Sequence, residues 1–255
     1  MSSEPSQLER TEGGTIAYHH SSGEGTGLLW LGGFNSDMDG TKVLALEEWA
    51  HAAGRPTTRF DYFAHGQSSG DFRDGTISRW RDDALAMIDE VTSGPIILAG
   101  SSMGGWLTIL AALARPDRVA GIVLTAPAPD FTEDLMWANF PEEVKAQIME
   151  KGEWLQPTEY DEFEPYPITK RLIEDGRNNL VLGGEIAITC PVRILQGMED
   201  PDVPWQHALR LAEKLKTDDV SVNLIKDGDH RLSTEQNIAR LIDTVESLAW
   251  EVDQN

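Results

Sequence analysis

The stretch PIILAGSSMGGWL, residues 95–107, decides the fold. It begins with a short apolar run typical of a buried strand, and residues 103–113 are apolar on nearly all sides, as in a helix buried against a sheet. Between the two, residues 100–104 form a G-x-S-x-G pattern, typical of a sharp strand-to-helix turn that exposes a nucleophilic serine. Glycine is expected on both sides because a Cβ there would collide with the neighbouring strand or helix. Ser102 has glycine at both positions and Ser101 does not, so Ser102 is the predicted nucleophile.

Apolar runs of strand length recur along the rest of the chain and alternate with amphipathic segments. The runs lie at residues 28–31, 57–61, 96–100, 119–124, 192–196 and 220–226. Helical spacing places apolar side chains on one face of three segments: Val43, Leu46, Ala50 and Ala53; Trp80, Ala84, Ile88 and Val91; and Ile238, Leu241, Ile242, Val245 and Leu248. This alternation predicts an α/β fold with a mostly parallel central sheet flanked by helices.

Residues 131–187 interrupt the alternation. They contain 13 Asp and Glu against 5 Lys and Arg, several aromatic residues, helical spacing at residues 142–151 and no strand pattern. We expect a core formed by residues 1–130 and 188–255, with residues 131–187 inserted as a lid over an active site. The alternative is a loop of solvated acidic helices without a role in function.

The composition limits the possible partners. The chain of 255 residues carries 21 Lys and Arg against 43 Asp and Glu, a formal net charge of −22. Nucleic acid and anionic membrane surfaces both attract basic residues, so neither is expected as a partner. No apolar run approaches the roughly 18–20 residues that a membrane span requires. Because residues 131–187 hold part of the acidic excess, the charge also favours neutral or cationic substrates over strongly anionic ones.

A single cysteine, Cys190, excludes an internal disulfide and a multi-cysteine zinc site. No cluster of acids and histidines has metal-ligand spacing, so no metal is expected. Residues 1–10 are polar and acidic, with neither the apolar stretch of a signal peptide nor the basic character of a transit peptide. A cytoplasmic protein is therefore expected, and the sequence does not indicate an oligomeric state.

A serine nucleophile needs a histidine as general base, and the histidine needs a carboxylate to fix its tautomer. His230 lies in the loop after the last apolar run, residues 220–226. In the order serine, acid, histidine, the base is expected in the loop after a late strand. Four histidines, His19, His20, His51 and His65, come before the nucleophile segment and are therefore too early in the chain to be the base. His207 falls in an expected surface helix.

Several carboxylates could serve as the acid. Asp200 lies three residues beyond the glycine that ends the run at residues 192–196, and it is the preferred candidate. Asp202 is the main alternative and Glu199 a weaker one. Asp130 is a further alternative because the acid sometimes follows the preceding strand.

Acyl transfer also requires backbone donors for the developing oxyanion. The N–H of Met103, next to the nucleophile, is one expected donor, and the N–H of Phe34, after Gly32 and Gly33, is the other. The expected apolar contacts for an acyl chain are Trp106, Trp137 and Trp154, each of which could equally be packing.

The motifs together resemble the α/β-hydrolase family of serine hydrolases over nearly the whole chain. Within it they are most similar to the mitochondrial branch that acts on palmitoylated proteins and acyl glucuronides. The segments that carry the resemblance are residues 59–62 (RFDY), 100–107 (GSSMGGWL), 151–154 (KGEW), 190–193 (CPVR), 197–200 (GMED) and 229–231 (DHR). One departure is that Gly32-Gly33 replaces the common His-Gly pair, which removes a side chain that often braces the oxyanion loop.

The resemblance implies an α/β-hydrolase fold with a helical lid inserted after the sixth strand. It implies a triad of Ser102, Asp200 and His230, no cofactor, and hydrolysis of acyl thioesters or carboxylic esters through an acyl-enzyme. The substrate would be a small molecule or an acylated protein. A general carboxylesterase, a lipase or a peptidase on the same fold remains an alternative, as does a ligand-binding protein without turnover.

Overall fold

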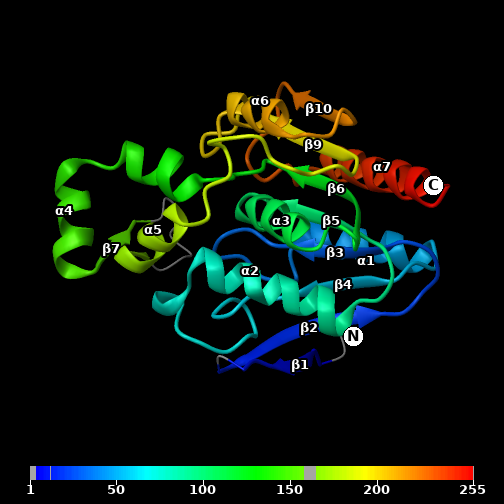
Figure 1. Ribbon diagram of the computed structural model, residues 1–255, viewed down its shortest axis with the longest axis horizontal. Helices are drawn as coiled ribbons and strands as arrows, with labels where there is room; N and C mark the ends of the chain where they lie inside the picture. Colours follow the sequence, from blue (N-terminus) through cyan, green and yellow to red (C-terminus); the bar gives the residue numbers. More distant parts are fainter. Residues whose placement is uncertain (1–3, 12, 158–164, 255) are drawn as a thin grey trace.

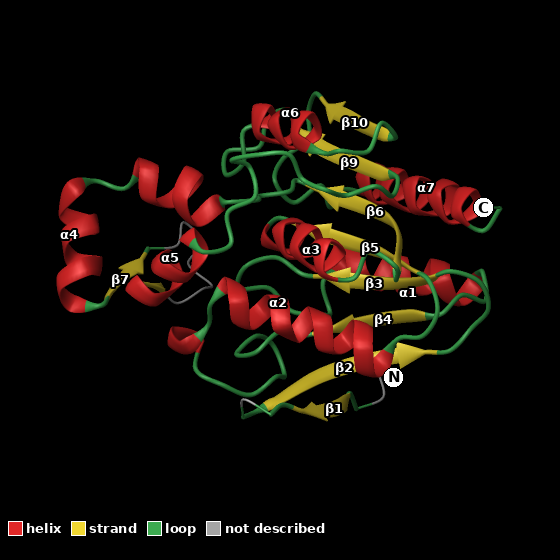
Figure 2. Cartoon of the chain, in the orientation of Figure 1, coloured by secondary structure: helices red, strands yellow, loops and turns green. Residues whose placement is uncertain are grey.

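The computed structural model describes residues 4–11, 13–157 and 165–254. A central β-sheet forms its core (Figures 1 and 2). Within these residues the sheet has eight strands in the order β1-β2-β4-β3-β5-β6-β9-β10. Neighbouring strands from β4 to β10 run parallel, and β2 runs antiparallel to β1 and β4. The strands are β1 Ser6–Glu9, β2 Thr15–Ser21, β3 Gly27–Leu31, β4 Thr57–Phe60, β5 Ile96–Ser101, β6 Val119–Thr125, β9 Val192–Gly197 and β10 Val220–Ile225.

The six apolar runs of the sequence form the parallel strands, which confirms the predicted fold class. β3 shows why these runs are continuously apolar: Leu29 and Leu31 pack on one face of the sheet, and Leu28 and Trp30 pack on the other. A strand covered on both faces has no polar side, so it loses the alternation that marks a half-exposed strand. β1 and β2 were not predicted, because they are largely polar strands at the edge of the sheet.

Helices cover both faces (Figure 2). The helices α2, α3 and α6 pack on one face of the sheet, and α1 and α7 pack on the other. Their bounds are α1 Thr41–Ala52, α2 Ile77–Ala86, α3 Met103–Ala114, α6 Trp205–Lys214 and α7 Glu235–Val252, with a 3-10 turn at Phe72–Asp74 and a π-helical continuation of α2 at Met87–Val91. Ala53 was expected on the buried face of α1, but it is exposed because the helix ends at Ala52.

The insertion after β6 lies beyond the carboxyl ends of the parallel strands, at the left of Figure 1. It contains the π-turn Thr132–Met136, the 3-10 turn Trp137–Asn139, α4 Glu142–Lys151, β7 Glu153–Gln156, β8 Tyr166–Thr169 and α5 Lys170–Arg177. The pairing of β7 with β8 corrects the expectation of an insertion without strands. Both strands have only four residues and β8 contains Pro167, so neither shows a strand pattern. Residues 158–164 of the insertion lie outside the described residues.

Asp130 holds the two ends of the insertion together. Its Oδ1 accepts the N–H of Val181 and its Oδ2 accepts the N–H of Leu182, both at 2.8 Å. Burial raises the pKa of this carboxyl, and the two N–H donors oppose that effect without overcoming it. Asp130 therefore has a structural position at the base of the insertion.

None of the helices in the described part of the chain is long and apolar enough to cross a membrane.

Gly104, in the first turn of α3, sets how closely this helix approaches β3. A Cβ on Gly104 would overlap the carbonyl groups of Leu31 and Gly32. These atoms are backbone, so they cannot rotate away as a side chain would. The contact fixes the start of α3 directly against the loop that follows β3.

We therefore expect Gly104→Ala to lower the free energy of unfolding by about 1–3 kcal/mol or more, because the added methyl group must displace backbone atoms. The matched control is Gly183→Ala, where a Cβ meets no atom within 4 Å. It should change the free energy by less than about 1 kcal/mol. Urea unfolding of both variants measures the difference, and equal stabilities would contradict the close approach.

Candidate active site

Ser102 lies in the turn between β5 and α3 with φ 54° and ψ −120°. This conformation is strained for a residue with a side chain, and it is characteristic of a nucleophile held at a sharp turn. A Cβ on Gly100 would overlap Thr108 Oγ1 and lie 2.5 Å from the carbonyl oxygen of Gly104. The collisions predicted from the sequence at both flanking glycines are thus present in the structure.

Three loops at the carboxyl edge of the sheet bring the predicted triad together. His230 Nε2 lies 3.1 Å from Ser102 Oγ, and His230 Nδ1 lies 2.8 Å from Asp200 Oδ2. Ser102 follows β5, Asp200 follows β9 and His230 follows β10. The residues are distant in sequence and meet because parallel strands end at the same edge.

The carboxylate of Asp200 is held by several donors. Its Oδ1 accepts the N–H groups of Asp202 (2.9 Å) and Val203 (2.8 Å), and its Oδ2 accepts Gln196 Nε2 (3.1 Å) as well as His230. Burial alone would raise the pKa of Asp200, but His230 and the backbone donors outweigh it, so the pKa lies below its ordinary value. An ionised Asp200 therefore favours the tautomer of His230 with its proton on Nδ1, in which Nε2 is the acceptor that faces the Ser102 hydroxyl.

The alternative acids do not contact His230 in this way. Glu199 and Asp202 are exposed, and both oxygens of Asp130 are occupied at the base of the insertion. Among the described residues, Asp200, Asp202 and His230 form the one group of potential metal ligands, with one atom of each within 4.8 Å of the others.

His207 does not lie on a surface, which corrects the expectation for this residue. It is 7% exposed, and its Nε2 lies 2.6 Å from the carbonyl oxygen of Pro129. The helix α6 packs this face onto the sheet rather than turning it to solvent.

The loop after β3 passes directly beside Ser102. A Cβ on Gly33 would lie 3.5 Å from Ser102 Cβ, and Phe34 and Met103 line the same cleft as Ser102. The backbone segments predicted as oxyanion donors are therefore adjacent to the serine. Their role in binding an oxyanion remains a prediction.

His65 braces this loop, a position that sequence reasoning missed. Its Nε2 accepts the backbone N–H of Asn35 at 3.1 Å, and its Nδ1 donates to the carbonyl oxygen of Phe63 at 3.1 Å. Both partners require the neutral imidazole, because a backbone N–H cannot accept a hydrogen bond. Burial lowers the pKa of His65 to about 4, which keeps the ring neutral. The sequence signal for this role is the replacement of the common His-Gly pair by Gly32-Gly33, because the loop then needs another histidine to brace it.

Two clefts meet at Ser102. One, of about 460 Å³, lies under the insertion and has a mainly apolar and aromatic wall that includes Phe34, Phe131, Leu135, Met136, Phe140 and Tyr166. The other, of about 470 Å³, lies on the side of α1 and the His230 loop, and its wall includes Ser36, Asp37, Lys42, His230, Arg231 and Ser233. Ser102 thus lies between a cleft lined mainly by apolar side chains and a second cleft whose wall also carries charged and hydroxyl side chains.

The three tryptophans predicted to contact an acyl chain line neither cleft, which corrects that prediction. Trp106 is fully buried, and its Nε1 donates to the carbonyl oxygen of Asn179 at 3.0 Å. Trp137 lies under the guanidinium of Arg177, 4.8 Å from the ring centroid, and Trp154 packs against Phe140. All three tryptophans therefore pack within the insertion or around α3, which is the alternative role that the sequence also allowed.

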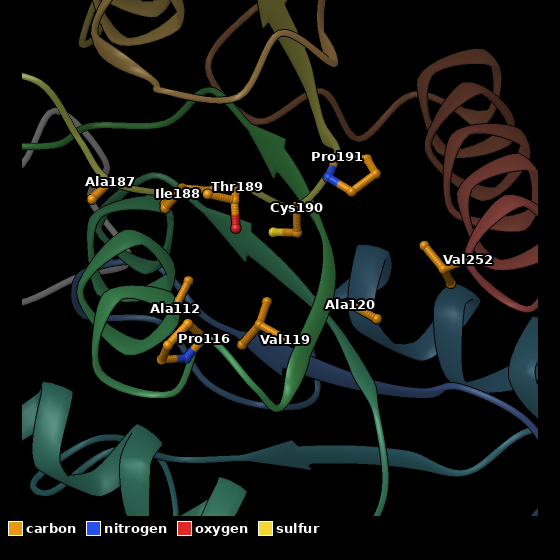
Figure 3. Close-up of a pocket in the computed structure, with 10 residues that line it drawn as sticks. All are labelled: Ala112, Pro116, Val119, Ala120, Ala187, Ile188, Thr189, Cys190, Pro191 and Val252. Carbon is orange, nitrogen blue, oxygen red and sulfur yellow. The ribbon is translucent and has the colours of Figure 1, made fainter. Parts of the chain in front are cut away.

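A further cavity, of about 330 Å³, lies beside Cys190 (Figure 3). Its wall comes from the end of α3 and the starts of β6 and β9, so it is at the opposite edge of the sheet from Ser102. Burial raises the pKa of Cys190 to about 11, which leaves the thiol protonated and unreactive at neutral pH.

The comparisons with known proteins agree with this geometry. The model of the prolyl oligopeptidase family matches residues 82–253. The mitochondrial palmitoyl-protein thioesterase ABHD10 of Mus musculus is 39% identical over 241 residues, which cover 94% of this chain and 81% of the relative. The chain belongs to the α/β-hydrolase family. The human relative of the same name is 37% identical over 94% of this chain and 78% of its own length.

Solved structures place the chain in the same family. Mouse α/β-hydrolase domain-containing protein 10 superposes with a TM-score of 0.91 at 37% identity, over 98% of this chain and 100% of that chain. A protein of Agrobacterium vitis S4 described as a hydrolase gives a TM-score of 0.92 at 43% identity, over 96% and 98% of the two chains. These relatives establish this chain as a hydrolase of the serine type.

The cytoplasmic location expected from the polar N-terminus is contradicted by these comparisons. Five relatives at 37–39% identity are named as mitochondrial proteins. The composition of residues 1–10 was therefore a poor guide to location.

The neutral state of His65 predicts a pH dependence of stability. Its pKa is about 4 when folded against an ordinary 6.5, so the unfolded chain binds the proton first and the folded state loses stability as pH falls from 6.5 to 4. Between pH 6.5 and pH 4, we expect this effect to lower the free energy of unfolding of wild type by about 3 kcal/mol and to be absent from His65→Gln.

Chemical unfolding of wild type and His65→Gln at pH 7 and pH 4.5 measures this effect. Burial also raises the pKa values of Asp61 and Asp83 to about 6, and these two groups add stability as the pH falls. Wild type and His65→Gln both contain them, so their contribution cancels in the difference between the two proteins. A difference in stability that does not change with pH would show that His65 is not held neutral.

Proposed function

We propose that this protein hydrolyses acyl thioesters or carboxylic esters through an acyl-enzyme formed on Ser102. The observation that supports this most strongly is the hydrogen-bonded chain from Ser102 through His230 to Asp200 at the junction of two clefts. Ser102 Oγ attacks the substrate carbonyl carbon while His230 Nε2 takes its proton. Asp200 stabilises the imidazolium without accepting the proton.

Collapse of the tetrahedral intermediate breaks the bond to the leaving sulfur or oxygen, which receives the proton from His230. Water then attacks the acyl-enzyme, gives a proton to His230 and releases the carboxylic acid. The backbone N–H groups of Phe34 and Met103 bind the oxyanion in both steps. Each such donor contributes on the order of 10²–10³ in rate.

We further propose that residues 131–187 act as a lid over the core of residues 1–130 and 188–255. The cleft of about 460 Å³, here named the lid cleft, runs between this insertion and Ser102, with Leu135, Met136 and Phe140 on its wall. Such a wall suits an acyl chain, since apolar area removed from water contributes about 25 cal/mol per Å². The names of the relatives support a thioester of a long acyl chain carried by a small molecule or a protein.

A peptidase is the second candidate, because the matching family model is that of the prolyl oligopeptidases. A lipase or a general carboxylesterase would use the same residues. The lid cleft favours an acyl chain over a peptide, since Asp202 is the charged residue on its described wall and the remainder is largely apolar.

We expect Ser102→Ala to lower kcat by about 10⁴-fold or more while the protein stays folded, because the nucleophile is lost. Asp200→Asn should lower kcat by about 10⁴-fold, because the amide favours the wrong tautomer of His230. The control Asp202→Asn removes the neighbouring carboxylate, which does not contact His230, and should keep kcat within about threefold of wild type. A Ser102→Ala variant with half of the wild-type rate would refute the mechanism.

A panel of thioesters and oxyesters of two to sixteen carbons tests the substrate class. We expect kcat/KM to rise with chain length until the lid cleft is filled, and Leu135→Trp to shift the optimum to shorter chains. Steady-state assays of wild type and variant measure the shift. A flat profile, or faster cleavage of proline-containing peptides than of any ester, would contradict the assignment of the lid cleft to the acyl chain.

A further inference from the structure

Phe34 connects the core of the protein to the insertion. Its side chain packs against the main core cluster, and it also packs against a second cluster built around Ile148, Ile168 and Ile173, here named the insertion cluster. Every other described side chain in the insertion cluster comes from residues 131–187. Among the residues that the structure describes, Phe34 is thus the one core residue whose side chain packs against this cluster.

The aromatic ring of Phe34 lies between rings from both parts of the protein. On the core side, its centroid is 5.1 Å from that of Phe72 and 5.7 Å from that of Trp80. On the insertion side, it is 5.7 Å from that of Phe131 and 5.6 Å from that of Tyr166, the first residue of β8. All four pairs meet edge to face, a geometry that aromatic rings prefer. The insertion therefore supplies two of the four rings that hold Phe34.

The backbone of Phe34 lies beside the reacting serine. A Cβ on the preceding Gly33 would lie 3.5 Å from Ser102 Cβ, and Phe34 lines both clefts at Ser102. In the mechanism proposed above, the Phe34 N–H binds the oxyanion, so the direction of this N–H determines how well the transition state is stabilised. The ring and the N–H are attached to the same Cα. Packing that restrains the ring therefore also restrains the N–H.

Polar contacts fix the loop beyond Phe34 to the core. The N–H of Asn35 donates to His65 Nε2 at 3.1 Å, and the N–H of Met38 donates to Asp61 Oδ1 at 2.7 Å. Both bonds come from the core and act on residues after Phe34. The contacts of the Phe34 ring are where the insertion reaches this loop.

We propose that the insertion positions the oxyanion donor of Phe34 through the ring contact between Phe34 and Tyr166. Tyr166 is then a positioning residue for the reaction, which acts through Phe34 and not on the reacting atoms. This inference rests on the proposed function, because it concerns the oxyanion formed in that reaction. It assigns the insertion a second role besides forming a wall of the lid cleft: the insertion also supports the rate for substrates too short to fill that cleft.

An acetyl ester separates positioning from binding of the acyl chain, because an acetyl group has one carbon beyond the carbonyl and leaves most of the lid cleft empty. With 4-nitrophenyl acetate, we expect Tyr166→Leu to lower kcat about tenfold, since a donor that contributes on the order of 10²–10³ is displaced but not removed. KM should change by less than about threefold, because the oxyanion exists only in the transition state. Tyr166→Phe keeps the ring and should restore most of the rate.

A double-mutant cycle tests whether the effect passes through Phe34. Phe34→Leu should lower kcat to a similar extent, and adding Tyr166→Leu to it should cause no further fall. Trp154→Leu is the matched control, because this ring packs against Phe140 within the insertion and lines neither cleft. Its kcat for the acetyl ester should lie within about threefold of wild type. Thermal unfolding of each variant confirms that it is folded at the assay temperature.

Two results would overturn the inference. Equal losses of kcat in Tyr166→Leu and Trp154→Leu would show that the rate requires only an intact insertion. A further tenfold fall when Tyr166→Leu is added to Phe34→Leu would show that Tyr166 acts by another route. An inactive wild-type protein would instead refute the proposed function, and the inference with it.

Discussion

The sharp turn that holds Ser102 is the constraint on which the rest of the site depends. It exists because Gly100 and Gly104 have no Cβ, so β5 can turn into α3 against the backbone of Leu31 and Gly32. The same contact brings the loop after β3 beside the serine. One backbone approach therefore positions both the nucleophile and the loop with the candidate oxyanion donors, before any side chain of the triad is considered.

The parallel sheet supplies the other half of the arrangement. Because β5, β9 and β10 end at one edge, Ser102, Asp200 and His230 meet although they are separated by up to 128 positions. The insertion borders this edge on one side, and α1 with the His230 loop borders the other. In the mechanism proposed above, the acyl group lies under the insertion.

Sequence reasoning predicted the parallel strands and Ser102 because both depend on local patterns, and it preferred Asp200 and His230 because each follows a later strand. Apolar runs and the G-x-S-x-G turn carry their own signal. It missed β1, β2 and the β7-β8 pair, whose short or polar strands form through pairing with distant segments. It also missed His65, since a brace between Phe63 and Asn35 is visible only once the two loops are folded together. The tryptophans were misassigned because aromatic residues that fill a core and those that line a cleft look alike in sequence.

Covalent labelling with a fluorophosphonate tests the central claim most directly, because the reagent mimics the tetrahedral state at an activated serine. The account predicts one label per chain, located by peptide mass mapping on Ser102, and labelling at least about 100-fold slower in His230→Ala. A label on Ser101 or Cys190, or an unchanged rate without His230, would contradict the assignment of Ser102 as a nucleophile activated by His230.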